Sequence, residues 1–193
     1  MPQLIAITGG IGSGKSVISR ILRSMGYPVY DSDTEAKALM DADDTIKERL
    51  RSEIAPETVR DNRIDREALA AIVFADADRL STLNRIVHSA VRQHLSRWQQ
   101  SQSAPVVFVE TAILFESGLN RMVDAEWRVD APVDLRVDRV MKRNGISRES
   151  VLARIESQQY TPAPDEPRPP LSIITNDGIA AVLPQVETLL QHI

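Results

Sequence analysis

The chain has 193 residues, of which 42% are hydrophobic and 26% charged, a composition typical of one folded domain with at most a small inserted subdomain. It has no cysteine, which excludes disulfides and thiolate metal sites. The formal net charge of −4 argues against general nucleic-acid binding, which needs clustered Lys and Arg. No apolar run approaches the ~20 residues of a membrane span, so we expect a cytoplasmic protein with no membrane partner.

The first predicted element is a strand over residues 4–8, followed by a glycine-rich run over residues 9–16 with the pattern Gly-x-x-x-x-Gly-Lys-Ser. Glycines let such a loop turn so that successive N–H groups point at one anion. Lys15 then supplies a positive charge for the β- and γ-phosphates, and the Ser16 hydroxyl coordinates Mg²⁺. A glycine-rich turn that matches by chance is the alternative. We expect nucleotide contacts from Gly10, Ile11, Gly12, Ser13, Gly14, Lys15, Ser16 and Val17.

A helix is predicted next, because apolar residues recur at helical spacing from Lys15 to Met25 and Gly26 then ends the pattern. The N-terminus of this helix carries a partial positive charge that points at the phosphates. Residues 28–30 predict a short second strand, which runs into an acidic loop over residues 31–33. A helix over residues 34–40 follows.

Asp31 and Asp33 come at the end of the second predicted strand, two residues apart, so that they share a face in an extended chain. Open α/β sheets place ligand groups at the carboxyl ends of strands. One of these carboxylates can accept the proton of an attacking hydroxyl or help to hold Mg²⁺ through water. The alternative is a turn with a helix N-cap, since Asp33 directly precedes the predicted helix.

Residues 41–100 are rich in Ala, Leu, Arg, Asp and Glu, and they predict helices over residues 66–74 and 78–98 without a convincing strand. We therefore expect a helical insertion. His88 lies in this insertion, where a histidine is more often part of the edge of a core than a ligand.

Residues 105–109 form an apolar, β-branched run of the kind found in buried parallel strands, and the run ends at Glu110. P-loop proteins often carry an acidic residue at this place for the metal or for a water. A solvated strand end is the alternative. A loop over residues 111–118 and a strand over residues 126–130 follow.

Two helices are predicted over residues 133–144 and 148–159, and together they form a basic hairpin. Its arginines can act as a lid over transferring phosphates, although most basic side chains on helices are simply solvated. Five of the eleven prolines lie between residues 160 and 170, which excludes regular structure there. A strand over residues 171–174 and a helix over residues 179–192 complete the chain. This alternation predicts an α/β fold with a central parallel sheet between two layers of helices.

Five segments together resemble the dephospho-coenzyme A kinase family, in order and spacing, over nearly the whole chain: residues 8–16, 31–33, 83–88, 113–116 and 176–178. The phosphate loop alone is shared by many families, whereas the combination is specific. The resemblance implies transfer of the γ-phosphoryl group of ATP to the ribose 3′-hydroxyl of dephospho-coenzyme A, the last step of coenzyme A synthesis. It also implies a P-loop three-layer αβα fold similar to that of nucleoside monophosphate kinases, with a helical substrate domain and a lid.

The resemblance also divides the chain, which we expect to form a single P-loop kinase unit over residues 1–193. The core covers about residues 1–40, 103–132 and 171–193, the helical substrate-binding insertion about 41–102, and the lid about 133–170. We expect a monomer or a weak homo-oligomer.

The resemblance further implies individual roles. Asp33 matches the catalytic base, and Lys15 and Ser16 match the ligands of the phosphates and Mg²⁺. Arg143 falls in the lid pattern Arg-x-x-x-Arg and is expected to bind nucleotide and assist catalysis, while Asn176 approaches the nucleotide. The expected substrate-binding residues, besides Asp33, are His88, Leu114, Phe115, Glu116 and Arg154, the last of which is followed by Gln158.

The chain departs from the family pattern at Ser89, Ala112 and Asp177, and residues 160–170 replace a stretch that is usually basic. The alternative function is that of another small P-loop kinase, which acts on a nucleoside, a nucleotide or a small metabolite. A nucleotide-dependent switch is a remoter one, because the chain has no Asn-Lys-x-Asp stretch to read guanine.

Overall fold

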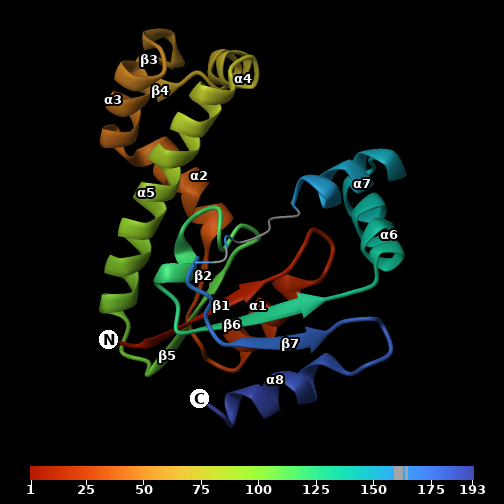
Figure 1. Ribbon diagram of the computed structural model, residues 1–193. Helices are drawn as coiled ribbons and strands as arrows, with labels where there is room; N and C mark the ends of the chain where they lie inside the picture. The colour runs from red at the N-terminus through yellow and green to blue at the C-terminus, as the bar shows by residue number, and fades with distance from the viewer. Residues whose placement is uncertain (159–162, 164) are drawn as a thin grey trace. The chain divides into compact units, whose positions relative to one another are not determined.

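The computed structural model describes residues 1–158, 163 and 165–193 (Figure 1). The chain forms two compact units: the first comprises Met1–Asp31 and Gln99–Ile193, and the second comprises Ser32–Trp98. Residues 160–162 and 164 of the proline-rich segment lie outside the described residues. Its remaining residues form neither helix nor strand, as the prolines predict.

The first unit contains a sheet of five strands in the order β2-β5-β1-β6-β7. Every pairing is parallel, which confirms the predicted parallel sheet, and helices flank it. Because parallel strands end at one edge, the residues that follow them gather at that edge. The strands are β1 (Gln3–Thr8), β2 (Val29–Asp31), β5 (Val106–Glu110), β6 (Ala125–Asp130) and β7 (Leu171–Thr175).

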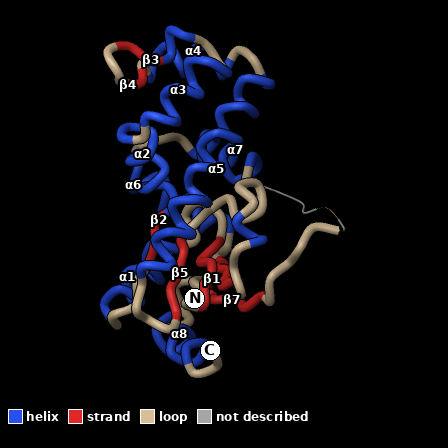
Figure 2. Tube along the Cα trace, turned by 90° about the vertical axis from the view of Figure 1, so that its left-hand side faces the viewer, coloured by secondary structure: helices blue, strands red, loops and turns tan. Residues whose placement is uncertain are grey.

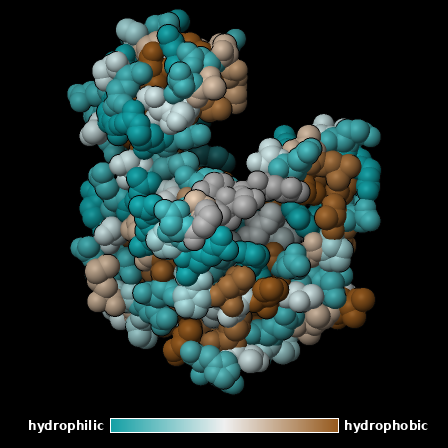
Figure 3. Space-filling model, viewed as in Figure 1, coloured by the Kyte–Doolittle hydropathy of each residue, from teal (hydrophilic) through white to brown (hydrophobic). Residues whose placement is uncertain are grey.

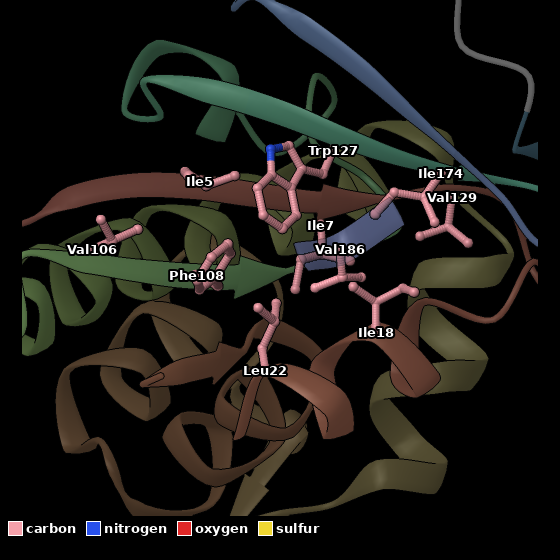
Figure 4. Packing of buried hydrophobic residues seen from close by; sticks show 10 residues of the cluster. All are labelled: Ile5, Ile7, Ile18, Leu22, Val106, Phe108, Trp127, Val129, Ile174 and Val186. Atoms are coloured by element: carbon pink, nitrogen blue, oxygen red, sulfur yellow. The ribbon is translucent and has the colours of Figure 1, made fainter. Parts of the chain in front are cut away.

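One face of this sheet packs against α1 (Lys15–Ser24) and α8 (Val182–Leu190). Figure 4 shows the aromatic rings of Phe108 and Trp127 among aliphatic side chains from both helices. The two ring centroids are 5.1 Å apart, within the range of favourable aromatic pairs. Because β1 and α1 both contribute to this core, it fixes the two ends of the loop between them.

The predicted basic hairpin is formed by α6 (Val133–Asn144) and α7 (Arg148–Ser157). The bounds of α6 are those predicted, and Gly145 ends the helix at a φ of 66°. A small core of its own joins the two helices: Val137, Val140, Val151 and Ile155.

The second unit consists mainly of helices α2 (Ser32–Ala42), α3 (Asp44–Glu53) and α4 (Arg66–Phe74), together with most of α5 (Ala77–Ser101). The bounds of α4 agree with the prediction.

The expectation that this region lacks strands is wrong. A short 3₁₀ helix (Pro56–Thr58) leads into β3 (Val59–Arg60), which pairs with β4 (Arg63–Ile64), drawn in red in Figure 2. The two residues between the strands, Asp61 and Asn62, have φ values of 48° and 58°. Asp and Asn tolerate this left-handed conformation and favour two-residue hairpin turns, but four strand residues leave no periodic signal.

Two further boundaries differ from the prediction. Residues 31–33 form no loop, because β2 ends at Asp31 and α2 begins at Ser32. Asp33 therefore lies in the first turn of α2, where the helix dipole favours a carboxylate, and it does not precede the helix as an N-cap. At the other end of the chain, the Asp177 carboxylate accepts hydrogen bonds from the N–H groups of Ile179 and Ala180. This turn delays the last helix until Val182.

Within the described ranges, no helix is both long and apolar enough to span a membrane.

We expect Leu22→Ala to lower the free energy of unfolding by about 2–5 kcal/mol, because it leaves a cavity in a fully buried part of the core. Urea titration of the purified protein would measure the loss. Leu183→Ala on α8 is the matched control, because Leu183 is 47% exposed and its truncation removes little buried area. Equal losses in the two variants would contradict the described packing.

Candidate active site

The loop between β1 and α1 has the geometry of an anion-binding nest. Gly14 caps α1 at a φ of 104° and makes no side-chain cap, so the first N–H groups of the helix are not satisfied by a side chain. Among the described residues, the N–H groups of Gly12, Gly14 and Ser16 have no acceptor. Such N–H groups at a helix N-terminus form a site for phosphate.

Other N–H groups of the loop are already engaged. Val17 donates its N–H to the carbonyl of Gly14 at 2.9 Å, and Ser13 donates to the carbonyl of Gly10 at 3.1 Å. A phosphate that contacts either group would share the donor or displace the turn. The predicted contacts from Gly12, Gly14 and Ser16 therefore need the least rearrangement.

The Lys15 side chain folds back across the loop. Its Nζ atom donates to the carbonyls of Gly9 at 2.7 Å and Gly10 at 3.3 Å. The ammonium group is thus held beside the nest, at the end formed by the first loop residues. A bound phosphate would meet this charge after a small movement of the side chain.

The α6–α7 hairpin holds the peptide groups of Ile11 from both sides. The Ile11 N–H donates to Oε1 of Gln158 at 2.8 Å, and the Ile11 carbonyl accepts from Nε of Arg136 at 2.9 Å. The Ile11 side chain packs against the small core of the hairpin. Loop and hairpin are therefore joined by two hydrogen bonds and a shared apolar contact.

Arg139 and Asn176 hold the next part of the loop. Nη1 of Arg139 lies 3.4 Å from the carbonyl oxygens of both Gly12 and Ser13, and Nη2 donates to the Asn176 carbonyl at 3.1 Å. The Asn176 side chain donates to the Ser13 carbonyl at 2.7 Å and is buried. Asn176 therefore supports the phosphate loop, and its predicted contact with the nucleotide stays a prediction.

Acidic side chains stand at the carboxyl edge of the sheet. Asp31 ends β2 directly opposite Glu110 at the end of β5, and Glu110 in turn pairs with Ile7, next to the phosphate loop. Asp33 follows Asp31 by two residues in the chain but belongs to the second unit. Both interpretations of Glu110, as a metal-site residue and as a strand end, fit its half-buried position.

A cavity of about 500 Å³ opens beside the loop in the first unit. Thr8, Glu126 and Arg128 form part of its wall. Oε1 of the buried Glu126 accepts hydrogen bonds from Thr8 at 2.6 Å and from Arg128 at 3.0 Å. The residues that complete the lining are Gly9, Gly10, Ala112, Leu114, Phe115, Glu116, Gln158, Arg168, Pro169 and Leu171.

The lining of this cavity is mixed in character. Leu114, Phe115 and Leu171 are apolar, and Figure 3 shows brown side chains over β7, where Leu171 is 47% exposed. Burial raises the pKa of the Glu116 carboxyl above its ordinary value, and the negative charge of Glu166 adds to the shift. The cavity can therefore take a ligand that carries both apolar and polar groups.

Two of the predicted arginines contact no part of the loop. Nε of Arg143 donates to its neighbour Asn144 at 2.8 Å, and Arg154 is exposed with no polar side-chain contact to the part of the chain that the structure describes. His88 lies on α5 in the second unit. The roles of Arg143, Arg154 and His88 therefore stay predictions.

The sequence reasoning gave no role to Arg136 and did not identify the contact of Gln158 with the loop. A spacing signal did exist for Arg136, because it lies three residues before Arg139 and so shares its helical face. No local signal shows that this face meets a loop more than 120 residues earlier in the chain. Only the folded structure provides that contact.

Comparison with known proteins agrees with this geometry. The model of the family described as dephospho-CoA kinase matches residues 3–179. A dephospho-CoA kinase from Porphyromonas gingivalis is 42% identical over 155 residues, which is 80% of this chain and 77% of that protein. One from Bacteroides fragilis is 37% identical over 189 residues, with 96% and 90% covered. The crystal structure of TT1252 from Thermus thermophilus, at 40% identity, superposes with a TM-score of 0.76 over 99% of this chain and 95% of that one.

We expect Gly14→Ala to raise the dissociation constant of ATP at least ~10-fold, because the displaced loop would lose hydrogen bonds from its N–H groups to the phosphates. A Cβ at this position would overlap the Asn176 amide and would sit at a φ of 104°. Calorimetric titration with ATP would measure the effect.

Gly26→Ala is the matched control for this variant. Gly26 has a similar φ of 90°, yet apart from Gly26 itself and its two chain neighbours no described atom lies within 4 Å of the position that a Cβ would take there. It should cost about 1 kcal/mol of stability and leave ATP affinity unchanged. Unchanged ATP affinity in Gly14→Ala would refute the described support of the loop.

Proposed function

The chain belongs to the dephospho-CoA kinase family and phosphorylates dephospho-CoA with ATP in coenzyme A biosynthesis; from that premise, we propose that the γ-phosphoryl group passes directly to the ribose 3′-hydroxyl. The observation that carries this mechanism is the phosphate loop: the N–H groups of Gly12, Gly14 and Ser16 have no acceptor among the described residues, while Lys15, Arg136 and Arg139 hold carbonyls of the same loop. A loop of this kind binds phosphates through its backbone and needs no covalent intermediate.

In this proposal Asp33 is the general base. It orients the 3′-hydroxyl and accepts its proton as the oxygen attacks the γ-phosphorus. Lys15 neutralises charge on the β- and γ-phosphate oxygens during transfer. The β-phosphate oxygen of ADP leaves on the opposite side of the γ-phosphorus. The products are ADP and coenzyme A, which is dephospho-coenzyme A phosphorylated on its ribose 3′-hydroxyl.

Mg²⁺ fits the donor set near the loop. The Ser16 hydroxyl and the carboxylates of Asp31 and Glu110 are hard oxygen ligands, and the latter two end neighbouring strands at the same edge of the sheet. Within the described part of the chain, no group of three or more His, Cys, Asp and Glu side chains could hold a metal. We therefore propose that Mg²⁺ binds together with ATP, with Ser16 as its ligand from the loop and the carboxylates of Asp31 and Glu110 as the acidic groups beside it. The ion would neutralise charge on the β- and γ-phosphates.

We further propose that the cavity beside the loop forms part of the acceptor site. Its mixture of apolar walls with Glu116, Arg128 and Arg168 suits a substrate arm that alternates amides with hydrocarbon. We also propose action in the cytoplasm, where ATP is available, as a monomer or weak homo-oligomer.

The test of the reaction is an assay of ATP- and Mg²⁺-dependent phosphorylation, with adenosine, AMP and shikimate as competing acceptors. NMR of the product would establish the position of the new phosphate. A 3′-phosphate on dephospho-CoA alone is the expected result. Turnover with only another acceptor would overturn the proposed acceptor chemistry and leave the phosphate loop as an ATP site.

We expect Asp33→Asn to lower kcat by ~10²–10⁴, the range for a general acid–base group, with nearly unchanged affinity for ATP. Steady-state kinetics and calorimetry would separate the two quantities. Asp41→Asn is the matched control, because Asp41 lies on the same helix and forms an exposed ion pair with Arg66. An Asp33→Asn enzyme with a near-normal kcat would remove Asp33 from the role of base.

A further inference from the structure

Arg136 lies directly against the phosphate loop, although it comes more than 120 residues later in the chain. Its Nε atom donates to the carbonyl of Ile11 at 2.9 Å. Its guanidinium group covers Gly10 so closely that a Cβ there would overlap Nη2. Its own carbonyl lies 2.6 Å from the position of a Cβ at Gly12. Three consecutive loop residues thus contact Arg136.

The guanidinium group has unused hydrogen-bonding capacity. Nε is engaged with Ile11, whereas neither Nη atom has an acceptor within the described ranges. The negative charge of Asp130 acts on it, but the two form no ion pair in the described structure. Burial lowers the pKa of the Arg136 guanidinium below its ordinary value, with the negative charge of Asp130 opposing the shift. Arg nevertheless stays protonated in proteins, so a half-buried cation with free donors stands beside the loop.

Burying such a cation costs free energy unless an anion pairs with it and accepts its hydrogen bonds. The anion that this site is built to receive is the triphosphate. Lys15 indicates where the β- and γ-phosphates would lie, since the lysine of this motif contacts those two groups. Nζ of Lys15 lies 3.3 Å from the carbonyl oxygen of Gly10, and Gly10 is the residue that the Arg136 guanidinium covers. Lys15 and Arg136 therefore flank the same end of the loop.

We propose that Arg136 binds the γ-phosphate of ATP through its free Nη groups and stabilises the charge on that group during transfer. The proposal rests on the proposed function only in taking ATP as the bound nucleotide. It makes Arg136 a catalytic residue by contact with the transferred group. Arg139, by contrast, is occupied with the carbonyls of the loop and of Asn176, and Arg143 with Asn144.

The test compares nucleotides that differ only in the γ-phosphate. Arg136→Gln removes the charge but keeps an amide that can donate toward Ile11. Calorimetry would measure the dissociation constants of a non-hydrolysable ATP analogue and of ADP, each with Mg²⁺. The constant for the triphosphate should rise ~10–100-fold, the range for one charged hydrogen-bonded contact, while that for ADP changes less than about 3-fold. The kcat for phosphoryl transfer should fall at least ~10-fold.

Two further variants complete the design. Arg136→Met keeps the apolar stem against Gly10 without any donor, and it provides the same comparison should Arg136→Gln fail to fold. Arg148→Gln removes an exposed arginine of the same hairpin, which pairs with Asp134 at 2.6 Å, and it should alter neither dissociation constant.

An equal rise in both dissociation constants would show that Arg136 only supports the loop and would overturn the proposal, as would unchanged affinity for the triphosphate. This outcome is independent of the acceptor, because no dephospho-CoA enters the binding measurement. The two proposals can therefore fail separately. If the unchanged enzyme did not phosphorylate dephospho-CoA but Arg136→Gln still lost affinity for the triphosphate alone, the proposed function would be refuted and the role of Arg136 supported.

Discussion

The geometry of the site depends on how the carbonyl groups of the phosphate loop are held. The N–H and C=O groups of a peptide point in opposite directions, so a donor that fixes a carbonyl also fixes the direction of the neighbouring amide. Lys15, Arg136, Arg139 and Asn176 donate to carbonyls within Gly9, Gly10, Ile11, Gly12 and Ser13. Among the described residues, the N–H groups of Gly12, Gly14 and Ser16 are thereby left for an anion. The glycines are required on the same grounds, because the space that side chains would fill is taken by Asn176, Arg136 and the backbone of β6.

This arrangement also couples the loop to the α6–α7 hairpin. Ile11 contributes its side chain to the small core of the hairpin and both of its peptide groups to Arg136 and Gln158. A phosphate that displaced Gln158 from the Ile11 N–H would release one of these attachments, and a phosphate bound by Arg136 would strengthen another. The hairpin is therefore positioned to respond to the nucleotide through contacts of a few residues. The hairpin contacts the loop directly, so this response needs no chain of intermediate residues.

The sequence predicted those parts of the structure that depend on residues close to one another in the chain. Apolar periodicity and Gly145 sufficed for the bounds of α6, and the glycine pattern sufficed for the loop before α1. The hairpin of β3 and β4 was missed because strands of two residues show no alternation. The placement of Asp33 inside α2 was missed because a strand that passes directly into a helix has no loop residues to mark the change. The contacts of Arg136 and Gln158 with the loop could not be predicted, because a basic or amide side chain on a helix is usually solvated and only the tertiary structure brings these two to Ile11.

The charge of the chain gives a further reason for this local arrangement. Both substrates are anions, whereas the formal net charge is −4, so the field of the whole protein does not attract them. Charges beyond ~8 Å are largely screened at physiological ionic strength, and the overall repulsion is therefore weak at the site itself. What acts there is the helix N-terminus, the loop N–H groups and the cations within contact distance of the loop. A half-buried Arg136 is more effective in this setting than an exposed arginine, since water screens its charge less. An acidic protein can thus bind ATP because its few essential cations are packed against the backbone that holds the phosphates.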